Sequence, residues 1–230
     1  MMDKTEAIAL SKARASMYRF LGGLYIMEVD KEQLALLKKM VFPEIEGTGD
    51  ADQDLKEGYA LIRDYVAGIT EEDLEDLAAD YAKVFLAAGD AAGRAAFPYE
   101  SVYVNKKHQV GGSTEMQMHA LYKARGREAD PHVYRTMDDN IGLMLEYQGM
   151  LCEELTEALE ADDREKAEAL LKEQKAFLKT HLTNWVHSFS GDILRYAGLD
   201  FYKGVAKITG GFMKQETEFL KEGVSAWDIA

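Results

Sequence analysis

The stretch that decides the fold is residues 138–159, DDNIGLMLEYQGMLCEELTEAL. It contains no proline, and its apolar residues return at the spacing of one helical face. Asp138 and Asp139 stand at its start, where acidic side chains favour a helix N-terminus. The stretch therefore predicts the longest helix of the chain, entered through an acidic cap.

Helical patterns continue on both sides of this stretch. Helices are predicted over Thr5–Ile26, from Asp30 to before Pro43, over Leu55–Val66 and Glu71–Leu86, from Thr114 to Gly126, and over Asp163–Leu182, Trp185–Tyr196, Asp200–Thr209 and Phe212–Leu220. Asp30 with Gln33, and Thr70 with Asp73, have the spacing of N-terminal caps. The pair Gly210–Gly211 predicts a break between the last two helices.

Two segments interrupt the helical pattern. Ala87–Gly112 is rich in glycine, and Arg127–Thr136 forms a second loop. At most a short extended piece, around Ser101–Val104, is expected in the first loop. The sequence shows no strand pattern of useful length and no internal repeat. We therefore predict an all-α fold, a single helical bundle over residues 1–230 with two long inter-helix loops.

Composition and charge limit the kind of partner. Of the 230 residues, 47% are hydrophobic and 30% are charged, which is typical of a folded soluble domain and not of disorder. The net charge of −14 argues against a nucleic-acid partner and permits a cationic peptide. No apolar run reaches about 18 residues, and the N-terminus lacks the features of a secretory signal. We therefore expect a cytoplasmic protein with no stable membrane insertion.

The sequence lacks the motifs of metal, phosphate and nucleophile chemistry. Its histidines, which form no HExxH and no helical Glu-x-x-His pair, are His108, His119, His132, His181 and His187. It contains no GxxxxGK phosphate loop and no GxSxG turn. Its one cysteine, Cys152, lies in a helical stretch and is expected to be an inert packed thiol. We therefore predict no catalytic residue, no metal and no cofactor.

Two segments stand out for their residue types. Residues 97–103, FPYESVY, lie in the first loop, and residues 137–147, MDDNIGLMLEY, enter the long helix. In one interpretation the first segment is an aromatic plug that docks the loop, and the second is a helix cap. In the other, the aromatics, Glu100 and the Asp138–Asp139 pair line a peptide groove with apolar walls and a few polar groups. The residues themselves leave both interpretations open.

Several short motifs, taken in order, are similar to those of a known family. They are Arg14–Leu21 with an Arg-x-x-x-Tyr-x-x-Leu pattern, Asp80–Phe85 (DYAKVF), Pro98–Tyr103 (PYESVY), Tyr122 with Gly126, His181 with Leu182 and Trp185, and Phe201–Tyr202. With these motifs the sequence resembles, across nearly its whole length, the TorD/DmsD family of cytoplasmic chaperones for molybdenum-containing redox enzymes, related to the NarJ type. The PYESVY match is the strongest.

The sequence departs from the family pattern where the long helix begins. The family usually reads Pro-x-Asp-His-Ile-Gly-x-Glu-Leu-Glu-Phe-Met there, in the region thought to engage the client's signal peptide. Met137, Asn140 and Met144 replace the proline, the histidine and the first glutamate, whereas Asp139 and Glu146 match. Asn140 can donate and accept hydrogen bonds but does not titrate near neutral pH.

The resemblance implies an all-helical, non-catalytic chaperone. Such a protein would bind the twin-arginine leader, the apo catalytic subunit, or both, of a molybdopterin oxidoreductase, support cofactor insertion and delay export. The acidic chain suits a leader that carries paired arginines and an apolar stretch. A helical hydrolase that uses carboxylates and a general protein-binding scaffold are the alternatives. Monomer and domain-swapped homodimer both stay open.

The resemblance and the residue types together give one candidate peptide-binding set. It consists of Tyr99, Glu100, Ser101, Tyr103, Asp138, Asp139, Asn140, Leu143 and Glu146. Its carboxylates are the expected partners of arginine, and its tyrosines with Leu143 are the expected apolar walls. His181 and Trp185 are expected to be packing residues.

Overall fold

A computed structural model describes residues 2–89, 94–127 and 136–222. These residues form helices and no strands, which confirms the predicted all-α fold. None of the described helices is both long and apolar enough to cross a membrane. The helices form two compact units: a first unit of residues up to Ile26, Tyr99–Asn184 and from Glu216 onward, and a second unit of Met27–Pro98 and Trp185–Gln215. A single domain over residues 1–230 stays a prediction.

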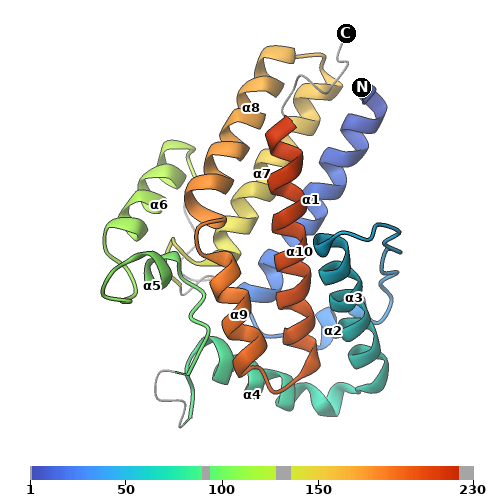
Figure 1. The fold of residues 1–230 in the computed structure, drawn as a ribbon, viewed down its shortest axis with the longest axis vertical. Helices are drawn as coiled ribbons and strands as arrows, with labels where there is room; N and C mark the ends of the chain where they lie inside the picture. The colour runs from blue at the N-terminus through green and yellow to red at the C-terminus, as the bar shows by residue number, and fades with distance from the viewer. Residues whose placement is uncertain (1, 90–93, 128–135, 223–230) are drawn as a thin grey trace. The chain divides into compact units, whose positions relative to one another are not determined.

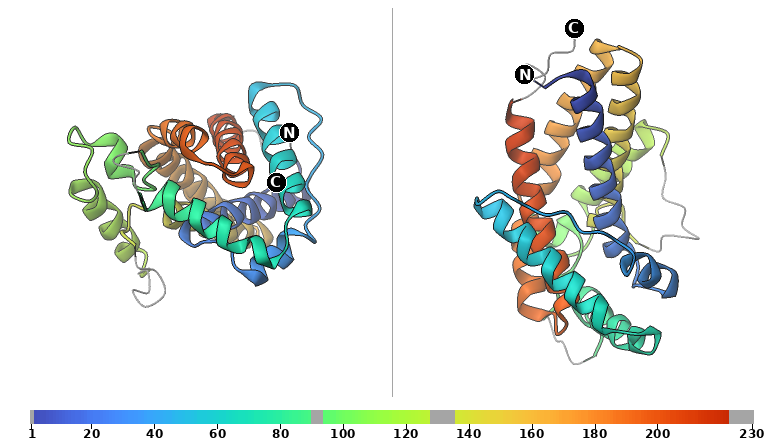
Figure 2. Two further views of the ribbon diagram at one scale, coloured as in Figure 1. Left: turned by 90° about the horizontal axis from the view of Figure 1, so that it is seen from below. Right: turned by 90° about the vertical axis from the view of Figure 1, so that its right-hand side faces the viewer.

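The first unit is built around two long neighbouring helices. It contains α1 (Lys4–Ile26), α5 (Glu100–Val104), α6 (Ser113–Ala124), α7 (Ile141–Glu160), α8 (Arg164–Phe177), a π-helical turn (Leu178–Leu182) and the end of α10 (Asp200–Glu222). Figures 1 and 2 show α1 and α7 side by side. A Cβ on Gly142 would lie 2.9 Å from the carbonyl oxygen of Gly22. The two helices therefore touch backbone to backbone at this point, which requires glycine.

Helix α7 begins at Ile141 and not at Asp138. The side chain of Asn140 accepts a hydrogen bond of 2.8 Å from the N–H of Gly142, so this asparagine is the N-terminal cap. The acidic pair instead lies in the turn before the helix. Helix α7 has 20 residues, whereas α1 and α10 have 23 each, so the prediction that α7 is the longest helix is wrong.

Two elements of the second unit begin at side-chain caps. It contains α2 (Lys31–Leu37), α3 (Asp50–Gly68), a 3-10 turn (Glu71–Asp73), α4 (Leu74–Phe85), α9 (Val186–Tyr196) and the first part of α10. Asp30 and Gln33 bond each other's backbone N–H in a capping box. Thr70 and Asp73 form the second box. Both predicted caps are confirmed, because each depends only on residues three positions apart.

The DYAKVF motif joins α4 to helices from the end of the chain. The buried carboxylate of Asp80 accepts hydrogen bonds of 2.9 Å from the N–H groups of Gly198 and Leu199, between α9 and α10. The ring of Phe85 lies 5.5 Å from that of Tyr202, in an edge-on arrangement. The motif therefore shapes the core of the second unit.

Helix α10 runs unbroken from Asp200 to Glu222, so the predicted break at Gly210–Gly211 is wrong. The glycines serve close packing instead. Figure 1 shows α10 beside α3, and a Cβ on Gly211 would lie 2.7 Å from the carbonyl oxygen of Ala51. The missing side chain lets the two backbones approach while α10 keeps its helical conformation.

We expect Gly58→Ala to lower the free energy of unfolding by about 1–3 kcal/mol. A Cβ at Gly58 would lie 2.8 Å from the carbonyl oxygen of Gly204 and 2.8 Å from the backbone nitrogen of Ile208. The control is Gly68→Ala in the same helix, where no atom lies within 4 Å of the new Cβ. It should raise stability by up to about 1 kcal/mol. Urea denaturation compares the two, and equal stabilities would contradict the proposed backbone contact.

Candidate functional site

The two segments that stand out in the sequence meet in the first unit. Tyr99 and Asn140 form an isolated antiparallel bridge. The N–H of Glu100 donates to the carbonyl oxygen of Asp139 at 3.0 Å. The N–H of Ser101 donates to Oδ2 of Asp139 at 2.9 Å. The PYESVY segment is thereby pinned to the turn before α7.

Glu100 is buried at this junction, with 3% of its surface exposed. Its Oε2 lies 3.0 Å from Nδ1 of His181, and its Oε1 accepts a hydrogen bond of 3.4 Å from Nδ2 of Asn184. His181 belongs to the π-helical turn, a kind of irregularity that is frequent at functional sites. The sequence identified His181 only as a packing residue, because 81 positions separate it from Glu100. With these contacts, Glu100 holds the junction together.

Ser101 organises the loop that follows it. Residues 100–104 form the short helix α5, so the predicted extended piece is wrong. The fully buried Ser101 hydroxyl accepts a hydrogen bond of 2.9 Å from the N–H of Gly111. Asn105 Nδ2 donates to the carbonyl oxygen of the same glycine at 3.2 Å.

The two tyrosines of the segment differ in their surroundings. Tyr103 is partly exposed on α5. The Tyr99 hydroxyl accepts a 3.2 Å hydrogen bond from Thr136. Most contacts of the segment are thus anchoring contacts, as in the plug interpretation.

The acidic pair before α7 divides between surface and interior. Oδ2 of Asp138 lies 2.7 Å from Nδ1 of His119, at the surface. Asp139 is fully buried. Its Oδ2 is bonded to Ser101, whereas its Oδ1 has no hydrogen-bond partner among the described residues. Because a buried acceptor without a donor is destabilising, a further donor at this turn would be favourable.

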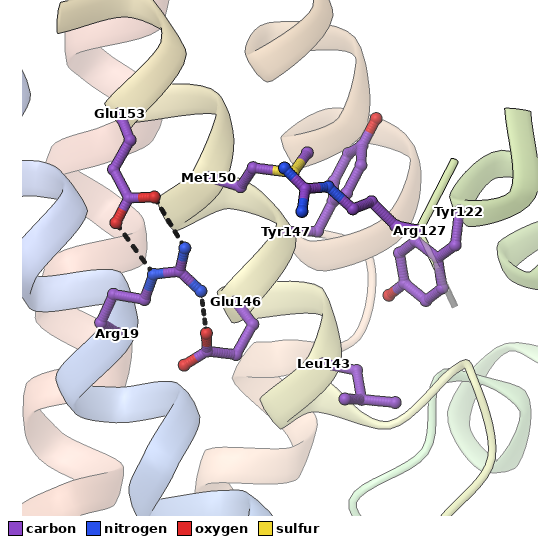
Figure 3. A pocket seen from close by; sticks show the side chains of 8 residues that line it. All are labelled: Arg19, Tyr122, Arg127, Leu143, Glu146, Tyr147, Met150 and Glu153. Atoms are coloured by element: carbon purple, nitrogen blue, oxygen red, sulfur yellow. Dashed lines mark hydrogen bonds and ion pairs between the residues drawn. The ribbon is translucent and has the colours of Figure 1, made fainter. Parts of the chain in front are cut away.

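An open pocket of about 320 Å³ lies in the same unit, along one side of α7 (Figure 3). It is lined by Arg19, Tyr122, Arg127, Leu143, Glu146, Tyr147, Met150 and Glu153. Of the predicted site residues, Leu143 and Glu146 line it, and the others do not. Helix α7 supplies most of the lining, because positions three and four apart share one helix face.

Two carboxylates at the pocket hold one guanidinium. Arg19 of α1 donates through Nε and Nη2 to the two carboxylate oxygens of Glu153, at 3.1 and 2.7 Å, and through Nη1 to Glu146. Gly149 lies between the two glutamates, and a Cβ there would lie 3.3 Å from Nε of Arg19. The missing side chain therefore makes room for the guanidinium. Hydrogen bonds to Glu153, and then to Glu146, raise the pKa of Arg19, although burial opposes its charge.

Tyr122 lines the pocket from α6. It is 6% exposed, and its ring centre lies 5.5 Å from that of Tyr147. Its buried hydroxyl has no hydrogen-bond partner within the described parts of the chain. Burial, followed by the negative charge of Asp138, raises the pKa of Tyr122, so this hydroxyl is neutral at pH 7 and able to donate. Neither Tyr122, Arg19 nor Glu153 was among the predicted site residues.

The remaining reactive side chains do not gather into a site in the described residues. No group of three or more His, Cys, Asp or Glu side chains in this part of the chain could hold a metal ion. His132 lies outside the described residues. Cys152 is buried, and burial raises the pKa of its thiol to about 12, as expected for an inert packed cysteine.

Comparison with known proteins gives matches over most of the chain. Residues 48–190 match the family described as nitrate reductase delta subunit. The chain is 29% identical to the chaperone protein TorD of Vibrio vulnificus, over 94% of the chain and 98% of that relative. It is 27% identical to the chaperone protein TorD of Photobacterium profundum, over 94% of the chain and 97% of that relative. Identity to the chaperone protein TorD of Shewanella pealeana is 24%, over 95% of each.

Proposed function

Because the chain belongs to the nitrate reductase delta subunit family, which includes the TorD chaperones, we propose that it binds the twin-arginine leader of a molybdopterin oxidoreductase. The protein is a chaperone of redox-enzyme maturation and not an enzyme. In this proposal the client is the apo catalytic subunit that carries the leader. Binding would support cofactor insertion and delay export. Since the client is met before export, a cytoplasmic location is part of the proposal.

The pocket beside α7 is the observation that carries the proposal. A leader of this type offers guanidinium groups next to an apolar stretch. The pocket offers carboxylates from Glu146 and Glu153 next to apolar surface from Leu143 and Met150. Guanidinium–carboxylate pairs are directional and bidentate, and peptide grooves combine apolar walls with a few polar groups. The chemistry of the pocket therefore matches both parts of the ligand.

The buried junction has a different role in this proposal. Glu100, Ser101 and Asp139 are engaged in contacts between α5, the π-helical turn and the start of α7. Asn140 caps α7 and so fixes where its pocket-lining face begins. These residues position the pocket, and we assign the partly exposed Tyr103 and Asp138 to the surrounding peptide surface. The predicted set thus splits into residues that support the site and residues that contact the peptide.

We expect Glu146→Gln and Glu153→Gln each to weaken leader binding about fivefold, equivalent to about 1 kcal/mol at a half-exposed site. The probe is a fluorescent synthetic peptide with an Arg-Arg pair followed by an apolar stretch, measured by fluorescence anisotropy. Glu157→Gln is the matched control, because Glu157 is exposed on the same helix and does not line the pocket. It should change the affinity less than twofold.

A Lys-Lys version of the peptide separates the proposal from its alternatives. Lysine carries the same charge but cannot form a bidentate pair, so it should bind more weakly than the Arg-Arg peptide. If both peptides bind equally well, or if all three glutamine variants lose affinity equally, the general scaffold is the better description. If instead the protein turns over a substrate and Glu100→Gln or Asp139→Asn abolishes that turnover, the hydrolase alternative holds.

A further inference from the structure

The carboxylates of the pocket already hold an arginine of the chain itself. In Figure 3 the guanidinium of Arg19 lies between Glu146 and Glu153, joined to both by hydrogen bonds. Two of its nitrogens face the two oxygens of Glu153, the paired geometry that distinguishes arginine from lysine. The described part of the chain shows no other ion pair for either glutamate. The site is therefore built for a guanidinium, and Arg19 is its present occupant.

This occupancy is weak enough to be exchanged. The side chains of Arg19, Glu146 and Glu153 are 40, 28 and 50% exposed. Ion pairs this open to water contribute little to stability. Arg19 is also long and flexible, so it can swing towards solvent without moving α1. An incoming guanidinium with the same geometry would take over these contacts, and a peptide already held by the apolar face would form them at a lower cost in side-chain entropy.

The pocket has room and polar capacity that Arg19 does not use. The pocket has a volume of about 320 Å³. Its apolar face is formed by the side chains of Leu143, Tyr147 and Met150. Tyr122 also lines it, and its buried hydroxyl has no hydrogen-bond partner in the described residues. Figure 3 shows this hydroxyl on the side of the ring nearer α7. A peptide that brings an arginine and an apolar neighbour could therefore gain contacts that Arg19 alone does not make.

We propose that Arg19 is an internal competitor, whose guanidinium holds the position that an arginine of the client peptide takes on binding. This inference rests on the proposed function, because it names the contact within the same pocket. On binding, one guanidinium replaces another between Glu146 and Glu153, so the carboxylates stay paired throughout. The apolar face of the pocket then supplies most of the net gain in affinity. Arg19 thus lowers the affinity for every arginine peptide, and only a peptide with an apolar neighbour gains contacts that offset this cost.

The test removes the guanidinium of Arg19 and compares the effect on affinity with the loss of an arginine outside the pocket. We expect Arg19→Met to tighten binding of the Arg-Arg peptide about 3–10-fold, because the two carboxylates lose their internal partner. Arg164→Met is the matched control, since it removes the same charge from an exposed ion pair with Glu168 in the first unit, and Arg164 does not line the pocket. It should change the affinity less than twofold. Arg19→Lys keeps the charge but cannot form the paired hydrogen bonds of a guanidinium, so it should tighten binding by an intermediate amount.

The possible outcomes distinguish a failure of the proposed leader binding from a failure of the proposed arginine exchange. If the wild-type protein does not bind the peptide, the proposed function fails and this inference fails with it. If the wild type binds and Arg19→Met leaves the affinity unchanged or weakens it, only the exchange is wrong. Equal tightening by Arg19→Met and Arg164→Met would also overturn it, because a general charge effect would then suffice. If Arg19→Met does not fold, Arg19→Lys and the control decide the matter.

Discussion

Replacing Glu216 by alanine is expected to lower the free energy of unfolding by about 3–5 kcal/mol. Glu216 and Arg14 form a buried, bidentate ion pair in the first unit, with two hydrogen bonds of 2.7 Å and only 3% of each side chain exposed. The hydroxyl of Tyr18 donates to the same carboxylate at 2.7 Å. Without Glu216, a guanidinium remains buried with no carboxylate to balance it, and that is the main source of the loss.

The neighbouring groups make this pair a network. Arg14 Nη2 also donates to Oε1 of Gln174 at 2.7 Å, and Gln174 Nε2 donates to the carbonyl oxygen of Leu151 at 3.0 Å. The guanidinium carbon of Arg14 lies 4.5 Å from the ring centre of Phe219. Helices α1, α7, α8 and the end of α10 therefore share one polar cluster. When one member of such a hydrogen-bond network is removed, the network loses more than one contact.

Urea denaturation of three variants tests the reason for the loss. Glu216→Ala and Arg14→Met should each be strongly destabilised, whereas the double variant Arg14→Met/Glu216→Leu should recover much of the loss, because no charge stays buried. If Glu216→Ala costs less than about 1 kcal/mol, the pair is not buried in solution. If the double variant loses the sum of the single losses, packing and not charge balance is responsible.

The Arg14 cluster shows what the sequence could and could not predict about the fold. Arg14 and Tyr18 belong to a motif that carried the family resemblance, and both lie on a helix predicted from its spacing. Their partner Glu216 lies far along the chain, at separations of 202 and 198 residues. Helix type and caps were predictable because they depend on residues within one or two turns. Pairings between distant helices depend on packing, which no local pattern records.

The same distinction explains the candidate site. Residue type identified Glu100 as a carboxylate in a distinctive loop, but its burial against His181 depends on the π-helical turn 81 positions later. Leu143 and Glu146 were identified and do line the pocket. Glu153 could have been predicted as a site residue in the same way, because it lies on the same predicted helix face as Glu146. Arg19 and Tyr122 could not have been predicted from α7 alone, since each lies on a different helix.

Gly210–Gly211 is a site where the local sequence pattern predicted the wrong structure. A glycine pair indicates a break when only the chain around it is considered, because glycine weakens a helix. In the structure Gly211 lies against the backbone of Ala51, and the helix continues. Tertiary packing reverses the local preference, and only the partner helix reveals why.

We expect Trp185→Ala to lower the free energy of unfolding by about 3–5 kcal/mol, as for other large buried aromatic residues. Trp185 is 1% exposed in the second unit, as predicted for a packing residue. Its ring centre lies 5.4 Å from that of Phe189, which in turn lies 6.2 Å from that of Phe85. Truncation therefore opens a cavity in an aromatic cluster that joins α4 to α9. Urea denaturation measures the loss, and unchanged stability would refute the core assignment.

Trp185→Phe is the matched control, because it keeps an aromatic ring against Phe189 and should cost less than half as much. The same two variants also test where the binding determinants lie. Trp185 belongs to the second unit, whereas every residue lining the pocket belongs to the first. Peptide affinity per folded molecule should therefore stay within twofold of wild type for both variants, even though their stabilities differ. A larger change in that affinity would mean that the second unit also contributes to recognition, and the pocket beside α7 would then be only part of the site.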